Sequence, residues 1–284
     1  MVSKRVTVAH PQGLHMRPAQ LLVSAMGRHP CEVTILAEGR RINGKSILSI
    51  LSACIRQGSE IELICSGAGE RAALEEAAPD LIVMTGDLVN REDRDLSRAL
   101  SLARMAAETA PAFFAPGNHE VDSPCWPELR DGLEAAGVQV LEDRAVLRNF
   151  RGEAVNLEGL WDLNHDPLGQ AHARETLPER IRVLCREGAL NVLLSHRPGL
   201  LEEYGAGGAD VVFCGHAHGG QVRLPLVGPV FAPDEGLFPK HTAGVYRTGE
   251  TRMVVSRGLG NGTPYPRLWN GPELVVVTMR RTGT

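Results

Sequence analysis

The sequence predicts an α/β protein built from two modules that meet near Pro79. The first 77 residues alternate strands and helices in the order βαββαβα, which is typical of an antiparallel sheet with helices on one face. Continuous apolar runs, which suit strands buried on both faces, follow Pro79. The charge balance changes there too: residues 1–79 hold 9 Lys/Arg and 7 Asp/Glu (net +2), the rest 21 and 27 (net −6). We therefore expect an α+β domain over 1–78 and an α/β domain over 79–284.

The elements of the first module follow from local patterns. Pro18 suits the first turn of a helix, where its missing N–H group costs nothing. Glu38-Gly39 favours a turn between two strands. Apolar residues from Ile47 to Cys54 recur at helical spacing. The predicted elements are strands at 4–9, 31–37, 40–42 and 60–65 and helices at 17–27, 46–57 and 70–77.

The second module contains buried strands that each end in polar residues. These strands are predicted at 80–85, 112–115, 191–195 and 211–214. Chemistry at the carboxyl ends of buried strands is the usual layout of open α/β sheets. The tail, Gly220 to Met279, is rich in Gly, Pro and short β-like runs.

Composition excludes several classes of protein. The net charge of −4 argues against a dedicated nucleic-acid binder, so no nucleic-acid partner is expected. No apolar run reaches the roughly 18 residues of a spanning helix, and the N-terminus lacks the apolar stretch of a signal peptide. The six cysteines include no Cys-x-x-Cys pair and are interpreted as reduced thiols of a cytoplasmic protein.

His15 lies just before the helix that Pro18 predicts. The unpaired N–H groups of a helix start could hold a phosphoryl group on the imidazole, and Arg17 adds a cation for the phosphate oxygens. Neutral imidazole is a reasonable nucleophile near pH 7. From the residues alone, a surface histidine that caps a helix is an equally open interpretation.

The segment from Gly13 to Ala19 resembles the active-site loop of HPr, the phosphocarrier of the sugar phosphotransferase system. The likeness extends over residues 3–77, including Asn43–Leu48 and Arg56–Ile61. It implies an open-faced β-sandwich in which His15 carries the phosphoryl group, Arg17 assists, and phosphotransferase-system enzymes are the partners. Met16 replaces the small residue that is usual there.

Ser46 matches the serine that a dedicated HPr kinase phosphorylates in some members of that family. It would begin the second helix, where an added negative charge meets the helix dipole favourably. A plain N-cap serine is the alternative interpretation, and both stay open.

The polar clusters at the strand ends of the second module contain carboxylate, amide and imidazole donors. This mixture suits Mn, Fe or Zn. Two such metals about 3.5–4 Å apart can bind a phosphate, activate a water and stabilise the leaving oxygen. A single histidine here would more often be structural, but three motifs at separate strand ends rarely coincide. The donors are Asp87, Asn118, His119, His196, His216 and His218.

These motifs resemble the calcineurin-like metallophosphoesterases over residues 79–282. Four of that family's five blocks occur in order: Gly86-Asp87, Gly117-Asn118-His119-Glu120, His196 and Gly215-His216-Ala217-His218. The resemblance implies an α/β/β/α sandwich that hydrolyses phosphate mono- or diesters.

The same resemblance implies a role for each donor. Asp87 would bridge two metals, and His218 would bind the second. Asn118, His196 and His216 would serve the first. His119 would donate to the leaving group or orient the phosphate. Segments from Gly219 to Gly260 resemble one bacterial branch whose members are in some cases membrane-associated, which leaves peripheral membrane association open.

The family's opening strand, which ends in Asp-x-His, is missing. Residues 1–79 contain no Asp, and no Asp-x-His occurs later. We therefore expect a sheet without its first strand, one metal site, a doubtful second site beside His218, and impaired hydrolysis. The alternative function is a phosphocarrier or regulatory protein of the phosphotransferase system, fused to an inactive phosphoesterase remnant.

Overall fold

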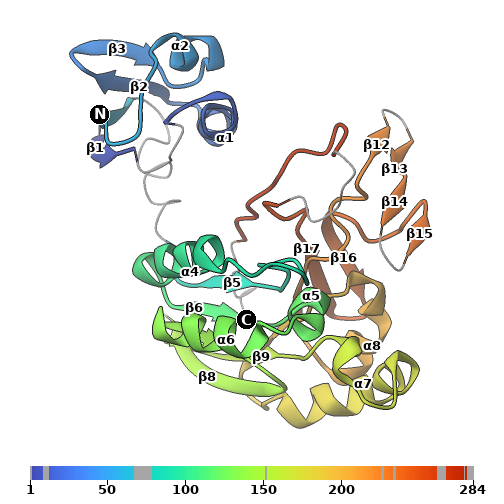
Figure 1. Cartoon of the computed structure of the whole chain (residues 1–284). Coiled ribbons are helices and arrows are strands. Elements are labelled where there is room, and N and C mark those ends of the chain that lie inside the picture. Colours follow the sequence, from blue (N-terminus) through green and yellow to red (C-terminus); the bar gives the residue numbers. More distant parts are fainter. Residues whose placement is uncertain are drawn as a thin grey trace. The chain divides into compact units, whose positions relative to one another are not determined.

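The computed structural model describes residues 2–8, 13–66, 79–150, 152–224, 227–232, 235–260, 267–277 and 279. The chain divides into two compact units, Met1–Pro79 and Asp80–Thr284. Figure 1 shows the first unit in blue and the second from green to red. The helix predicted at 70–77 lies outside the described residues.

In its described residues, the first unit is an antiparallel sheet with two helices on one face. The strands lie in the order β1-β4-β2-β3. Side chains of β2 alternate between exposed or half-buried and buried, so one face of the sheet packs against the helices. This confirms the predicted open-faced sandwich. The elements are β1 (Val2–Thr7), α1 (Met16–Gly27), β2 (Glu32–Ala37), β3 (Arg40–Asn43), α2 (Ile47–Ser52) and β4 (Glu60–Ser66).

Helix α2 ends earlier than the apolar pattern predicted. Cys54 has a left-handed backbone with φ of 50°, which stops the helix two residues after Ser52. The guanidinium of Arg40 donates to the carbonyl of Ala53 at 2.9 Å and satisfies one of the carbonyls at that end. The predicted helix at 46–57 is therefore too long at its C-terminal end.

The second unit holds two larger sheets. The first is parallel, in the order β5-β6-β7. The second has the order β16-β17-β11-β10-β9-β8, in which the four central strands are parallel and both edge strands antiparallel. The strands are β5 (Ile82–Met84), β6 (Ala112–Phe114), β7 (Val138–Val140), β8 (Arg144–Phe150), β9 (Glu153–Gly159), β10 (Leu190–Leu194), β11 (Val211–Cys214), β16 (Gly244–Thr248) and β17 (Thr251–Val255).

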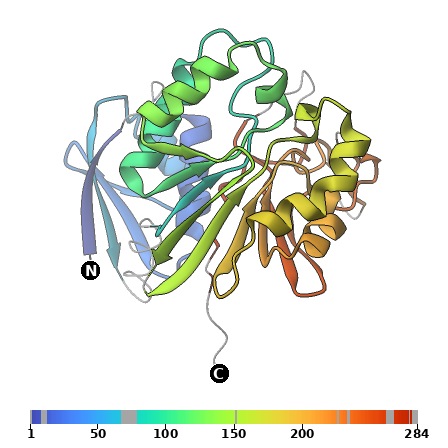
Figure 2. The ribbon, with the colours of Figure 1, turned by 90° about the horizontal axis from the view of Figure 1, so that it is seen from below.

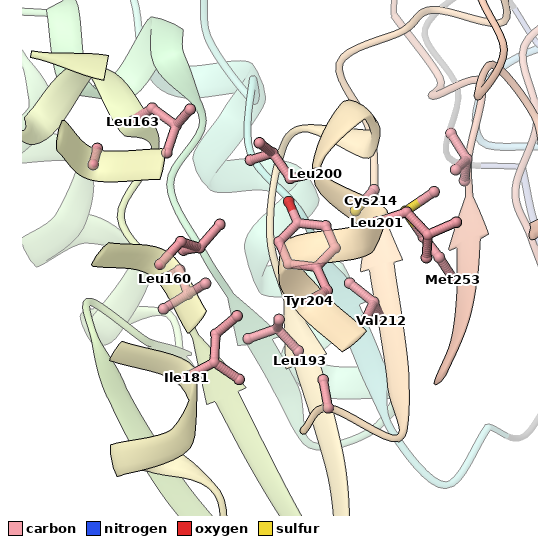
Figure 3. Close-up of a cluster of buried hydrophobic side chains, with 14 residues drawn as sticks. Leu160, Leu163, Ile181, Leu193, Leu200, Leu201, Tyr204, Val212, Cys214 and Met253 are labelled. Carbon is pink, nitrogen blue, oxygen red and sulfur yellow. The ribbon is translucent and has the colours of Figure 1, made fainter. Parts of the chain in front are cut away.

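Helices cover the outer face of each sheet. Helices α4 (Ser97–Thr109) and α6 (Trp126–Ala135) pack on β5–β7. Helices α7 (Gln170–Leu184) and α8 (Leu201–Gly207) pack on the larger sheet, where the fully buried Tyr204 ring lies among leucines (Figure 3). Figure 2 shows the green helices and the yellow helix on opposite sides of the strands.

A third apolar cluster, which includes Phe113, Leu157 and Val192, fills the space between the two sheets. The layers are therefore α/β/β/α, as predicted.

Strand β5 lies at the edge of its sheet. Among the described residues it pairs only with β6, and its three residues are half-buried, whereas those of β6 are fully buried. In the described residues the outer side of β5 is an open edge, as expected for a sheet without its first strand, and this edge is only three residues long.

Short elements complete the second unit. Four two-residue strands form two small hairpins, which project at the right of Figure 1. In the part of the chain that the structure describes, no helix is long and apolar enough to cross a membrane. The short elements are α5 (Asn118–Asp122), η1 (Leu163–His165), η2 (Pro198–Leu200), β12 (Arg223–Leu224), β13 (Gly228–Pro229), β14 (Phe231–Ala232) and β15 (Gly236–Leu237).

Candidate functional site

Three of the predicted metal ligands converge at the carboxyl ends of three strands. Asp87 follows β5, His196 follows β10 and His216 follows β11. One potential ligand atom from each residue lies within 4.8 Å of the others. The Nε2 atom of His196 is 3.1 Å from Oδ2 of Asp87 and 3.0 Å from Nδ1 of His216. Both histidines are buried, so this is a compact donor set shielded from solvent.

The imidazole of His196 is oriented by the strand that precedes Asp87. Its Nδ1 atom lies 2.6 Å from the carbonyl oxygen of Thr85, so Nδ1–H donates there and Nε2 faces Asp87. A carbonyl acceptor on the far nitrogen is the usual way in which a metal-binding histidine is held. Burial lowers the pKa of His196, but the Asp87 carboxylate outweighs it and raises that pKa to about 9. Burial opposes ionisation of Asp87, yet His196 and His119 hold its pKa below the ordinary value.

The close approach of these loops depends on two glycines. A Cβ atom on Gly86 would lie 2.4 Å from the nitrogen of Gly117 and 2.8 Å from Nδ1 of His196. A Cβ atom on Gly117 would lie 2.5 Å from Oδ1 of Asp87. The backbone at Gly86 also has a φ of 90°, in the left-handed region that favours glycine. The Gly86-Asp87 and Gly117-Asn118 motifs therefore begin with glycine because a side chain at either position would collide with the neighbouring loop or with a donor residue.

Glu120 joins the loop after β6 to the loop after β5. Its side chain is 0% exposed, and its two carboxylate oxygens accept four backbone N–H groups. The donors are Asp87 (2.7 Å), Leu88 (2.8 Å), Val89 (3.3 Å) and Gly117 (2.8 Å). Burial raises the pKa of Glu120, the charge of Asp87 raises it further, and these hydrogen bonds oppose the shift. The carboxylate thus fixes the backbone on which Asp87 stands.

Two further polar atoms at this edge are buried without a hydrogen-bond partner: Oδ1 of Asn118 and Nδ1 of His119. The backbone N–H of His119 donates to Oδ1 of Asp87 at 3.2 Å, which places α5 beside the carboxylate. A buried amide oxygen with no donor is costly unless a cation or water binds it. Carboxylate, amide and imidazole donors together fit a divalent metal ion.

His218 is oriented differently from the other donors. Its Nδ1 atom lies 3.3 Å from Nη2 of Arg267, and its carbonyl accepts the side-chain amide of Asn270 at 2.6 Å. Burial, and then the charge of Arg267, lower the pKa of His218 to about 4. In the described part of the chain, the grouped metal donors do not include His218.

In the first unit, His15 is exposed and immediately precedes α1. Its carbonyl accepts the N–H of Ala19 at 2.9 Å, so it stands at the helix start. Gly13, with φ of 64°, lies so close to Ile55 that a Cβ atom would be 2.1 Å from the Ile55 oxygen. Arg17 is in the first turn of α1, and its side chain lies outside the described residues.

Ser46 caps helix α2. Its hydroxyl oxygen accepts the backbone N–H of Ser49 at 3.3 Å. Ser46 is therefore an N-cap residue in the structure. Its role as a phosphorylation site is a separate proposal.

Comparison with known proteins assigns the second unit to a family. A family model described as calcineurin-like phosphoesterase matches residues 61–220, more than half of the chain. The chain belongs to the calcineurin-like phosphoesterase family. A second model, described as the phosphorylation site of the PTS HPr component, matches residues 2–79. The phosphoesterase therefore carries an HPr domain at its N-terminal side, and its family implies use of divalent metal ions.

The related proteins are similar either to the phosphoesterase part of the chain or to its HPr part. An uncharacterized metallophosphoesterase of Aquifex aeolicus is 32% identical over 216 residues, which is 74% of this chain and 76% of that protein. Phosphodiesterase YaeI of Escherichia coli is 32% identical over 194 residues, 66% of this chain and 65% of YaeI. The HPr-like protein Crh of Bacillus subtilis is 37% identical over 78 residues, 28% of this chain and 92% of Crh.

Sequence reasoning missed two residues of this calcineurin-like site. Glu120 is the last residue of the Gly-Asn-His-Glu motif. An acidic residue directly after Asn118 and His119 was the signal that could have indicated its role. Arg267 had no local signal, because its place beside His218 depends on the fold of the tail.

Proposed function

We propose that the second unit hydrolyses phosphoesters with one divalent ion held by Asp87, Asn118, His196 and His216. The observation that carries this proposal is the convergence of Asp87, His196 and His216 within 4.8 Å. The Asn118 oxygen, buried without a donor, supports a fourth ligand at the same edge.

Each group at the site has a distinct task. The bound ion would supply charge to polarise the phosphoryl group and lower the pKa of a water nucleophile. Asp87 contributes negative charge to hold the ion, and His196 is kept in one orientation by the Thr85 carbonyl. The Nδ1 atom of His119 has no hydrogen-bond partner and supports a role in donating a proton to the leaving oxygen.

The proposed substrate class is a phosphodiester or phosphomonoester, and similarity to a protein named phosphodiesterase favours the diester. The ion is Mn, Fe or Zn, because the donors are mixed oxygen and nitrogen. We expect impaired turnover relative to a two-metal enzyme, since the chain has no Asp-x-His to complete a second site.

The decisive experiment measures metal content and bis-p-nitrophenyl phosphate hydrolysis on the full chain. We expect about one ion per chain and metal-dependent turnover, both lost in Asp87→Asn and in His216→Gln. Asp131→Asn is the matched control, because Asp131 is a largely exposed residue of α6. A chain that binds no ion and hydrolyses no ester after metal is supplied would support the alternative, an inactive phosphoesterase remnant fused to a phosphocarrier.

We further propose that His15 accepts a phosphoryl group from a phosphotransferase-system enzyme, with Arg17 assisting. The exposed imidazole at the start of α1 supports this role, because N–H groups of a helix start attract phosphate. We also propose Ser46 as a target of an HPr kinase. Its hydroxyl already contacts the first turn of α2, where a phosphate would be favourable.

Two features bear on where the protein works. Large apolar side chains are exposed on and beside the small hairpins, and they support peripheral membrane association, which vesicle co-sedimentation of the full chain tests. All six cysteines are free thiols, which supports a reducing, cytoplasmic location. The exposed apolar residues are Leu224, Val227, Phe231, Leu237 and Phe238.

A further inference from the structure

We propose that the guanidinium of Arg267 binds the phosphoryl group of the substrate beside His218. There it serves as the second electropositive centre of a site that holds one metal ion. This inference rests on the proposed phosphoesterase function and names a group that binds the substrate's phosphate.

The segment that carries Arg267 is fixed to the loop that carries His218. The backbone N–H of Arg223 donates to the carbonyl of Leu268 at 3.0 Å, and the N–H of Leu268 donates to Gln221 at 3.3 Å. Leu268 and Val222 form a parallel bridge. The tail is far from His218 in the sequence, but these bonds pair it with the loop that follows His218.

Asn270 strengthens this attachment. Its side chain is 2% exposed, and its Nδ2 atom donates to the carbonyls of His218 at 2.6 Å and Gln221 at 3.2 Å. The intervening Gly219 has a φ of 68°, and a Cβ atom there would lie 2.2 Å from the Asn270 oxygen and 2.9 Å from Cγ of Arg257. A side chain at this position would push the tail away, so the contact requires glycine.

The contacts of Arg267 determine how His218 is used. Nη2 of Arg267 is 3.3 Å from Nδ1 of His218, and Nη1 is 3.4 Å from the carbonyl of Gly258. A guanidinium only donates hydrogen bonds, so Nδ1 of His218 must be the acceptor. Its lone pair on that nitrogen therefore faces Arg267 and is not directed at a metal ion.

The charge at this position suits a phosphate. Arg267 contacts His218, which lies two residues after the proposed ligand His216, so the guanidinium stands against the loop that carries this ligand. The aliphatic Cγ atom of Arg257 packs next to Gly219, and the Nε atom of Arg257 is 3.5 Å from the carboxylate of Glu273. A phosphate oxygen would be a stronger, charge-assisted acceptor than an imidazole or a carbonyl.

Arginine also matches the chemistry of phosphoryl transfer. Its planar fork binds two phosphate oxygens at once, whereas lysine offers a point charge. Negative charge on these oxygens in the transition state is stabilised by positioned cations. Arg267 thus supplies a fixed cation on the His218 side of a centre that lacks the Asp-x-His block.

The test measures inorganic phosphate binding by equilibrium dialysis, together with metal content, on the full chain in metal-free and metal-loaded form. In Arg267→Met we expect phosphate affinity to fall at least tenfold in both forms while metal content stays at the wild-type level. Arg252→Gln, an exposed arginine on β17, is the control and should bind phosphate normally. Unchanged phosphate affinity in Arg267→Met would overturn the proposal.

If Arg267→Met does not fold, Arg267→Lys decides. It should weaken phosphate binding about threefold or more, since lysine cannot bind two oxygens, and an affinity equal to wild type would refute the role of the guanidinium. The metal-free measurement separates this inference from the proposed function. A wild-type chain that binds no metal and hydrolyses no ester would contradict the hydrolase proposal. Phosphate binding to the metal-free chain tests the role of Arg267 whatever the outcome of that measurement.

Discussion

The carboxylate of Glu120 accepts the backbone N–H of Asp87 at 2.7 Å, so the loop after β6 holds the loop after β5. Three further backbone N–H groups donate to the same two oxygens. Asp87 thus owes its position to a side chain that has no place in the donor set.

Glu120→Gln should lower stability and metal affinity together. The amide offers one acceptor oxygen, and its NH₂ group faces donors, so buried N–H groups lose their partner at about 1–3 kcal/mol each. We expect a loss of about 2–4 kcal/mol in the free energy of unfolding, measured by urea denaturation. Glu108→Gln, at an exposed position on α4, should change neither quantity. A Glu120→Gln chain that keeps full stability would show that these hydrogen bonds are dispensable.

Gly117→Ala should weaken metal binding through crowding alone. The φ of Gly117 is −94°, which any residue adopts, so no backbone strain is added. The new methyl group would instead lie 2.5 Å from Oδ1 of Asp87 and 2.9 Å from Cε1 of His196. Metal titration should show at least tenfold weaker binding. The matched control is Gly271→Ala, where a Cβ atom meets nothing within 4 Å. Equal metal affinity in both variants would contradict the packing argument.

Phosphorylation of the first unit should depend on His15 and be independent of the metal centre. Incubation with the first enzyme of a phosphotransferase system and phosphoenolpyruvate should add one acid-labile phosphoryl group, detected by intact mass. His15→Ala should abolish the addition, whereas Asp87→Asn and His29→Gln should retain it. Transfer to His15→Ala at the wild-type rate would exclude His15 as the acceptor.

Glu158 should make the second unit less stable as pH rises. Its carboxyl is 0% exposed beneath Cys185, and burial raises its pKa to about 7, although the amide of Asn156 opposes the shift. In the unfolded chain the pKa of Glu158 has its ordinary value of 4.5. The stability that the protonated carboxyl contributes is therefore complete below pH 4.5 and is lost as the pH rises through 7.

Glu158→Gln should remove this dependence. Denaturation from pH 4.5 to 8 should show a loss of a few kcal/mol at most in wild type and a flatter profile in the variant. Profiles with the same slope would mean that the carboxyl ionises normally in the folded chain.

Much of this architecture is predictable because its signals are local. The apolar runs and the polar clusters after them give β5, β6, β10 and β11 and bring Asp87, His196 and His216 to one edge. The ligand roles of these residues stay predictions, since they await a metal measurement.

What sequence reasoning missed depends on distant contacts. Arg267 reaches His218 only because Leu268 pairs with Val222, which no spacing in the sequence indicates. The early end of α2 depends on a left-handed backbone at Cys54, and cysteine is not a residue that marks such a turn. Glu120 was visible within its motif, but its partners lie in another loop.

The shortness of β5 bears on how the second unit avoids aggregation. Open strand edges recruit strands from other molecules, and very short edges are one way in which proteins avoid this. An edge of three residues presents few unpaired backbone groups to another chain and is a poor template for fibre growth. The loop that carries Asp87 therefore follows a strand whose open side carries little risk of aggregation, and the carboxylate of Glu120 holds that loop from the other side of the sheet edge.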